Sequence, residues 1–396
     1  MLTRRRFLVR GLLAGLAALL AACASAVESI APSRAPSSAK PSPSHPAAPT
    51  PSPSPNGPSL REAIGQMLLI GFRGASVAEA EPVVRDIAQR GIGGILLFSR
   101  DQLTGADRNV RSPEQLGELI RGLGDAAPSV ALMVAIDQEG GQVARLGPDH
   151  GFDATPSAAE MGRGTPAETR EVARTMALTL RSVGVTLNLA PVVDVAVNPD
   201  NPIIAGVERS FSSDPAAVIA HAAAFIEGHH EAGIGCAVKH FPGQGSASGD
   251  THLGIVDVTE AWTDRELEPF AGLADAGLPD AVLTAHVFNA ALDPEHPATL
   301  SRPTVTGILR DRLGYRGVVI SDDLQMGAIR DAYGYPEALA LAIEAGVDVL
   351  LIANQLVYEP DIASRTIDIV ERLVREGRIG EERIRQSYER ILALKA

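Results

Sequence analysis

Cysteine and aromatic residues are scarce in this 396-residue chain. Its two cysteines, Cys23 and Cys236, could form at most one disulfide, so a disulfide framework and a cysteine-rich metal site are both excluded. One tryptophan and an aromatic content of 4% argue against a long groove in which rings stack on a polysaccharide. With 35 basic and 48 acidic residues the net charge is −13, which disfavours binding to nucleic acid.

Several motifs of metal and nucleotide sites are also missing. The chain has no His-Glu-x-x-His and no Walker loop, and Gly243-Gln244-Gly245 lacks the continuation of a dinucleotide-binding fingerprint. We interpret His229-His230 as part of a helix surface rather than as metal ligands. The sequence therefore predicts no metal and no cofactor.

The first 22 residues have the pattern of an export signal. Four arginines precede an apolar run over residues 11–22, which is too short to span a bilayer but suits the core of a signal peptide. Leu20-Ala21-Ala22-Cys23 resembles a bacterial lipobox, and the arginine run before Phe7-Leu8 resembles a twin-arginine signal. We expect removal of residues 1–22, acylation of Cys23 and attachment of the exported protein to the membrane. A plain secretory peptide with an incidental cysteine is the alternative.

Residues 23–59 are dominated by alanine, proline and serine. Such a segment has almost no side chain able to enter a core, which predicts a disordered, partly polyproline linker. At about 3.1 Å per residue it could extend roughly 100 Å, far enough for the folded part to work at the level of a cell wall.

Eight short apolar runs alternate with helical patterns from residue 60 to residue 396. Continuous rather than alternating apolar runs indicate strands buried on both faces, and eight of them favour a single α/β domain of the (β/α)8 TIM-barrel class. A doubly wound open sheet is the structural alternative. The expected strands are Met67–Ile70, Gly94–Phe98, Ala131–Ile136, Thr186–Leu189, Cys236–His240, Ala281–Ala285, Val318–Ile320 and Val347–Ile352, with helices over 166–182 and 215–232.

Polar residues follow nearly every expected strand. In a barrel these positions share the carboxyl-end face, where active sites are built, and so many ionisable groups beside a core are hard to explain by structure alone. The segments concerned are Asp137-Gln138-Glu139, Asn188 to Asp194, Lys239-His240, His286 and Ser321-Asp322-Asp323.

Together, these motifs resemble the family 3 glycoside hydrolases. The resemblance rests on Lys239-His240-Phe241-Pro242-Gly243-Gln244-Gly245, Asp250-Thr251-His252, Ser321-Asp322-Asp323-Leu324 and Asp137-Gln138-Glu139-Gly140-Gly141. Within that family the chain is similar to β-N-acetylglucosaminidases that trim peptidoglycan fragments, especially exported actinobacterial lipoproteins. The family often has histidine where this chain has Gln244, so we assign no catalytic role there.

The resemblance implies a retaining hydrolase that removes terminal β-linked N-acetylglucosamine from short glycan fragments. It implies that Asp322 is the nucleophile, that His252 with Asp250 supplies the acid/base, and that five residues hold the sugar: Asp137, Arg145, Arg209, Lys239 and His240. The residue types suit this chemistry, since retention needs a carboxylate below the anomeric carbon and a second group that moves a proton. We expect the enzyme to be a monomer.

Alternatives remain open for these roles. Asp323 could be the nucleophile in place of Asp322, and His252 could be an incidental histidine of a solvated loop. Lys239, Arg209 and Arg145 could each form an internal ion pair instead of binding sugar. At the level of function, the alternatives are a phosphorylase that uses the same glycosyl-enzyme and a non-catalytic lipoprotein that binds wall fragments.

Overall fold

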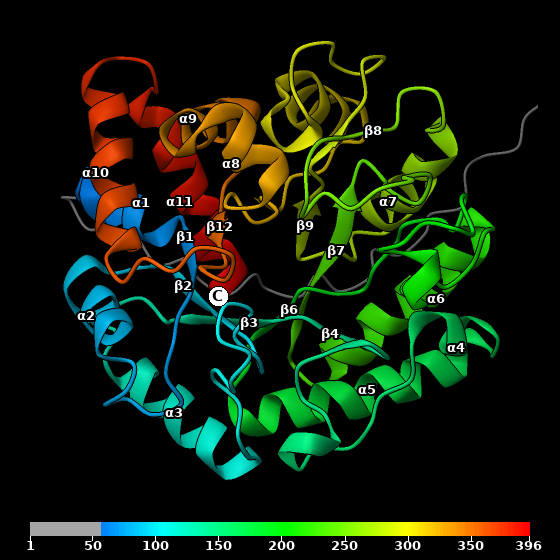
Figure 1. Ribbon diagram of the computed structural model, residues 1–396, viewed down its shortest axis with the longest axis horizontal. Helices are drawn as coiled ribbons and strands as arrows, with labels where there is room; N and C mark the ends of the chain where they lie inside the picture. Colours follow the sequence, from blue (N-terminus) through cyan, green and yellow to red (C-terminus); the bar gives the residue numbers. More distant parts are fainter. Residues whose placement is uncertain (1–56) are drawn as a thin grey trace, which may run out of the picture. The chain divides into compact units, whose positions relative to one another are not determined.

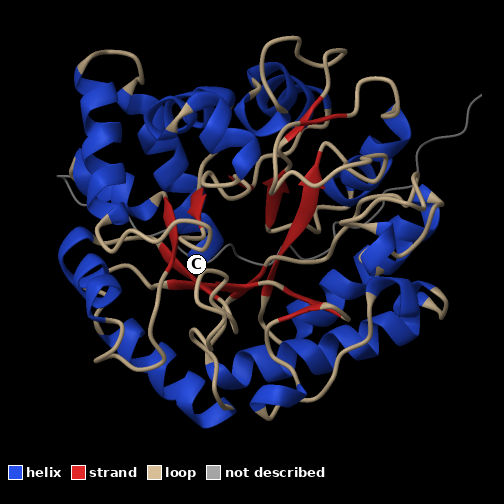
Figure 2. Cartoon of the chain, in the orientation of Figure 1, coloured by secondary structure: helices blue, strands red, loops and turns tan. Residues whose placement is uncertain are grey.

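The computed structural model describes residues 57–396. The expected export signal, Cys23 and nearly all of the linker lie outside the described residues. The described chain forms a barrel of parallel strands surrounded by helices (Figures 1 and 2). The strands of its sheet are β1 (Leu68–Gly71), β2 (Gly94–Leu97), β3 (Met133–Ile136), β6 (Leu187–Asn188), β7 (Gly235–Phe241), β9 (Ala281–Thr284), β11 (Val318–Ile320) and β12 (Leu350–Ile352).

The strand order confirms the predicted barrel. Neighbouring strands pair in parallel in the order β11-β9-β7-β6-β3-β2-β1-β12, and a bridge between Ile320 and Val349 brings the two ends of the sheet together. All eight expected strands are present, with end residues that differ by three positions or fewer. The open doubly wound sheet is therefore excluded.

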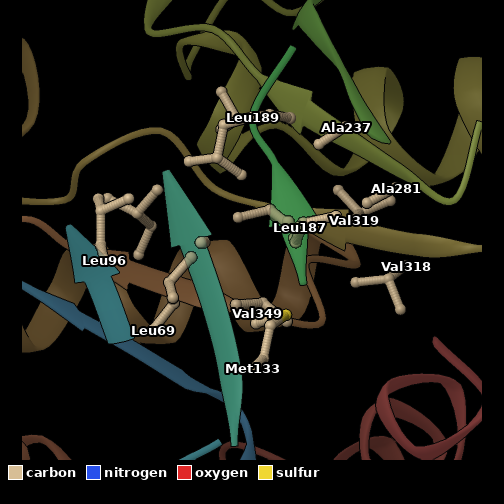
Figure 3. Packing of buried hydrophobic residues seen from close by; sticks show 14 of the residues in the cluster. Leu69, Leu96, Met133, Leu187, Leu189, Ala237, Ala281, Val318, Val319 and Val349 are labelled. Carbon is tan, nitrogen blue, oxygen red and sulfur yellow. The ribbon is translucent and has the colours of Figure 1, made fainter. Parts of the chain in front are cut away.

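The barrel strands are buried on both faces, which explains their continuous apolar sequences. Side chains such as Leu69, Leu96, Met133 and Leu187 fill the centre (Figure 3). Two short pairs lie outside the barrel sheet: β4 (Gln138–Gly140) with β5 (Val143–Ala144), and β8 (Val256–Asp257) with β10 (Val287–Phe288).

Capping residues explain where helices begin and end, as α5 illustrates. In α5, Thr165 and Glu168 form a capping box, Pro166 takes the first position and Gly184 ends the helix in the left-handed conformation. The helices are α1 (Leu60–Gln66), α2 (Glu81–Arg90), α3 (Pro113–Asp125), α4 (Ala158–Gly162), α5 (Pro166–Val183), α6 (Pro215–Glu231), α7 (Glu268–Asp275), α8 (Gly327–Tyr333), α9 (Tyr335–Ala345), α10 (Ile362–Arg375) and α11 (Glu381–Lys395); the shorter or wider helical turns are η1 (Pro148–His150), η2 (Ala205–Val207), η3 (Asp264–Leu267), η4 (Ala298–Leu300) and η5 (Pro303–Arg312).

One detail of the helix prediction was wrong. His229 does not lie on the surface of α6 but is fully buried, with Nδ1 3.1 Å from the Phe225 carbonyl and Nε2 3.0 Å from the amide nitrogen of Asn188. Burial lowers the pKa of His229 to about 4, so the ring is a neutral hydrogen-bonding group. Its neighbour His230 is partly exposed and lies 2.7 Å from the Asp280 carboxylate.

Residues 57–396 contain no grouping of three or more His, Cys, Asp or Glu side chains that could hold a metal ion. Among the helices of the same residues, none has the length and apolar character needed to cross a membrane.

Candidate active site

The residues singled out in the sequence gather at the carboxyl ends of the barrel strands, a face that we call the barrel mouth. Asp137 directly follows β3, Lys239 and His240 belong to β7, and Asp322 follows β11. This is the arrangement that a parallel barrel imposes on residues at strand ends.

Five charged side chains from four segments form one network at the barrel mouth. Lys239 Nζ lies 2.6 Å from Asp137 and 2.8 Å from Glu139, Arg145 lies 3.3 Å from Asp137, and Arg209 makes a bidentate pair with Glu139 at 2.7 and 2.8 Å. Burial would raise the pKa of Asp137 and Glu139, but nearby cations hold both below their ordinary values: Lys239, Arg145 and Arg209 for Asp137, and Arg209 and Lys239 for Glu139. The network is therefore ionised and rigid, with Asp137 still partly exposed to the mouth.

His240 is fixed at the edge of the same network. Its Nδ1 lies 2.7 Å from Asp194, and its Nε2 lies 3.3 Å from an Arg209 nitrogen. Because a guanidinium can only donate, Nε2 accepts and Nδ1 carries the proton toward Asp194. Asp194 also accepts the backbone N–H of Gln244 at 2.9 Å, so it orients both the ring and the loop behind it.

The structure distinguishes Asp322 from Asp323. The Asp323 carboxylate accepts backbone N–H groups of Gln325 and Ala353 at 3.1 and 3.0 Å, which turn it away from the mouth, and burial raises its pKa to about 6. Asp322 remains partly exposed. Burial would raise the pKa of Asp322, but the imidazoles of His286, His240 and His252 hold it below the ordinary value, so it is a carboxylate at neutral pH.

A closed set of hydrogen bonds supports the backbone around Asp322. The Asp322 N–H donates to Thr284 Oγ1 at 3.3 Å, Thr284 Oγ1 lies 2.8 Å from Thr299 Oγ1, and Thr299 Oγ1 lies 2.9 Å from His286 Nδ1. His286 Nε2 returns to the Asp323 carbonyl at 2.9 Å. His286 is fully buried and uses both nitrogens here, so it is a supporting group rather than a proton donor to substrate.

His252 and Asp250 form the expected pair on an exposed loop. His252 Nδ1 lies 2.7 Å from Asp250 Oδ1, and the same oxygen accepts the His252 backbone N–H at 2.9 Å. In the described part of the chain His252 Nε2 has no hydrogen-bond partner, and the side chain is about half exposed, at 49%. The pair therefore leaves one ring nitrogen, Nε2, free to donate or accept a proton.

The glycine-rich run before this pair packs tightly against the rest of the barrel. A Cβ on Gly245 would lie 1.7 Å from the Val195 carbonyl oxygen, and Ser246 and Ala247 are buried. Only residues from Ser248 onward are exposed, apart from the buried Thr251. These glycines serve close packing.

Sequence reasoning placed Glu139 and Asp194 at the carboxyl-end face but gave neither residue a role in the site. Both stand near strand ends, which was the available signal, but only the fold shows that Glu139 links Lys239 to Arg209 and that Asp194 holds His240. The internal ion pairs considered for Lys239, Arg209 and Arg145 are all present. Whether these residues also bind sugar stays a prediction. Arg145 Nε is buried and has no hydrogen-bond partner within residues 57–396.

Comparison with known proteins identifies the family. Residues 59–394 match the glycosyl hydrolase family 3 N-terminal domain. The chain is 39% identical over 298 residues to a β-hexosaminidase of Xylella fastidiosa, covering 73% of this chain and 83% of that one, and 35% identical over 346 residues to the β-hexosaminidase LpqI of Mycobacterium tuberculosis, covering 85% and 83%. A family 3 β-N-acetylglucosaminidase from Paenibacillus superposes with a TM-score of 0.78 at 35% identity, covering 86% of this chain and 62% of that longer chain. The chain therefore belongs to glycosyl hydrolase family 3, as an enzyme of the β-hexosaminidase type.

Proposed function

We propose that this enzyme is an exo-acting, retaining β-N-acetylglucosaminidase that releases terminal N-acetylglucosamine from peptidoglycan-derived fragments. The observation that carries the proposal is the meeting of an ionised carboxylate, Asp322, and an imidazole with one free nitrogen, His252, at one barrel mouth. The name of the Paenibacillus relative favours the same sugar. The low aromatic content favours short fragments over long polysaccharide.

In the first step the Asp322 carboxylate attacks the anomeric carbon while the bond to the leaving oxygen breaks. Protonated His252 donates its Nε2 proton to that oxygen, and the Asp250 carboxylate stabilises the imidazolium through Nδ1–H. The products are a glycosyl-enzyme ester on Asp322 and the released aglycone. Neutral His252 then takes a proton from water, whose oxygen attacks the same carbon and frees Asp322.

The charged network would hold the non-reducing sugar during both steps. Asp137 is a partly exposed acceptor for sugar hydroxyls, while Lys239 and Arg145 retain N–H groups not used by the network. Because their ion pairs already fix these groups, little ordering is needed when sugar binds.

A substrate comparison tests the reaction class. An aryl β-N-acetylglucosaminide should be hydrolysed much faster than the matched β-glucoside, with added phosphate leaving the rate and the product unchanged. A phosphate-dependent rate with release of a sugar phosphate would replace hydrolysis by phosphorolysis. Binding of fragments without turnover would contradict both reactions and favour the alternative of a non-catalytic lipoprotein that binds wall fragments.

Asp322 itself can be tested by substitution and by labelling. Asp322→Ala should lose at least about 10³-fold in turnover because the covalent route disappears. A 5-fluoro glycoside should label the wild-type enzyme on Asp322. A label on Asp323, or full activity of Asp322→Ala beside an inactive Asp323→Ala, would contradict the assignment.

A further inference from the structure

We infer that Gly327 is a positioning residue, the point at which the loop that carries His252 is docked against the segment that follows Asp322. The inference rests on the acid/base role proposed for His252. The inference adds to the proposed mechanism a glycine that does not touch the substrate and that acts only through its backbone and its lack of a Cβ.

Two backbone hydrogen bonds join the loop to this segment. The Gly327 N–H donates to the His252 carbonyl at 3.2 Å, and the Ala328 N–H donates to the Thr251 carbonyl at 3.4 Å. The loop carbonyls thereby satisfy N–H groups at the start of α8, where Met326 provides no side-chain cap. The acid/base loop and the segment after Asp322 are thus held together without a side chain.

The contact leaves no room for a Cβ at position 327. A Cβ built there would lie 2.8 Å from the His252 carbonyl oxygen and 3.1 Å from the Leu253 carbonyl carbon, where 3.4 Å or more is ordinary contact. The backbone of Gly327 does not have a positive φ, so alanine is free to adopt its conformation. Substitution would therefore strain the contact and not the backbone itself.

The loop is the side that would move. The segment after Asp322 is anchored: Leu324 N–H donates to Leu351, Met326 N–H donates to the Asp323 carbonyl, and both side chains are buried. Across the contact, His252, Leu253 and Ile255 are exposed, and Leu253 is 84% exposed. A displacement of about 0.6 Å restores ordinary contact, and it would carry the His252 ring away from its place at the mouth.

The test is Gly327→Ala, with Gly117→Ala as the matched control. Gly117 lies in α3, also without a positive φ, and a Cβ there would meet nothing within 4 Å. A sub-ångström misplacement of a proton donor should cost most where the leaving group needs protonation. We expect kcat/KM of Gly327→Ala to fall about 10- to 100-fold on chitobiose and less than about 3-fold on the dinitrophenyl glycoside, with turnover accelerated by azide. Gly117→Ala should match the wild type on both.

Two further measurements keep the test decisive. The fraction of enzyme labelled by the 5-fluoro glycoside counts competent sites, so rates expressed per labelled site exclude loss through misfolding. In a His252→Ala background, adding Gly327→Ala should change neither substrate further, because the group that Gly327 positions is already gone.

The outcomes separate this inference from the proposed mechanism. If His252→Ala slows chitobiose selectively but Gly327→Ala slows both substrates equally, or neither, the positioning role of Gly327 is overturned while the role of His252 stands. If His252→Ala itself shows no dependence on the leaving group and no response to azide, the acid/base assignment fails and the inference fails with it.

Discussion

The proposed mechanism does not use the carboxyl group of Glu266, which is buried beside the glycine-rich run that precedes His252. It is fully buried in η3, and one of its oxygens accepts the Ser246 N–H at 3.2 Å. Burial, with a smaller contribution from Asp194, raises the pKa of Glu266 to about 7. Near neutral pH the Glu266 carboxyl therefore exchanges a proton while Asp137 and Glu139 stay ionised.

This shift makes folding stability depend on pH. The pKa of Glu266 in the folded protein exceeds its ordinary value of 4.5. Its stabilising contribution to the free energy of unfolding is therefore fully present below pH 4.5 and is lost as pH rises through about 7. In Glu266→Gln the decline in the free energy of unfolding between pH 5 and pH 8 should be smaller by about 2 to 3 kcal/mol. Denaturant titrations of wild type and variant at pH 5 and at pH 8 measure this difference in the free energy of unfolding.

Glu260→Gln, at an exposed position of the same stretch of chain, provides the control and should keep the wild-type pH dependence. Buried Asp323 and Asp86, whose pKa values burial also raises, contribute equally to wild type and variant, so the difference isolates Glu266. An unchanged pH dependence in Glu266→Gln would show that its carboxyl titrates normally in the folded protein.

At the scale of single residues, the sequence was enough to identify the candidate catalytic residues but not the contacts that these and other site residues make. Asp322 and His252 could be singled out because each follows an apolar strand or belongs to a short motif. Glu139 could not be paired with Arg209, 70 residues away, because that pairing depends on which strands are neighbours. His229 was misread because its burial depends on Asn188 of β6, which no local pattern encodes.

Among the elements, η5 and α11 are joined to the segment just before β12 by one carboxylate. Fully buried Asp348 lies within 3.1 Å of Arg310, Arg383 and Arg390, and it also accepts from Ser387 and from the Val319 N–H. Three guanidiniums share one anion, so removing the anion leaves positive charges together in a poorly solvated place.

We expect Asp348→Ala to lower the free energy of unfolding by about 3 to 5 kcal/mol, because buried Arg310 and its half-buried neighbours Arg383 and Arg390 lose their shared carboxylate. The matched control is Asp361→Ala, which removes an ion pair with Arg85 whose carboxylate side chain is 76% exposed and should cost less than about 1 kcal/mol. Urea unfolding measures both. Equal small effects would mean that the cluster contributes little to the stability of the barrel.

Element positions were more accessible from sequence than element contacts. The eight strands could be predicted because a strand buried on both faces needs an unbroken apolar run. The tight packing of the loop after β7 could not, because Gly245 is small to admit the Val195 carbonyl and not to allow motion. A glycine that admits a close neighbour and a glycine that allows motion look the same in the sequence. Only the neighbours in the folded structure distinguish the two.

For the whole molecule, we propose export and attachment to the membrane through acylated Cys23. Cys23→Ala should release active enzyme from the membrane fraction, because the acidic barrel has no charge attraction to anionic lipid; from residue 23 onward the chain carries 31 basic and 48 acidic residues. Fractionation followed by an activity assay measures the release. Cys236→Ala, which changes a cysteine buried in β7, should stay with the membrane. Retention of Cys23→Ala through a high-salt wash would contradict the proposal.

Both ends of the barrel domain lie at the amino ends of its strands. The chain enters through α1, whose last residue, Gln66, donates to the Gly91 carbonyl just ahead of β2, and Lys395 reaches the Gly93 carbonyl at 2.6 Å. The barrel mouth lies at the opposite ends of the same strands. The described chain therefore begins at the face opposite the barrel mouth, so whatever precedes α1 is joined to the barrel away from the catalytic groups and leaves the approach of substrate to them open.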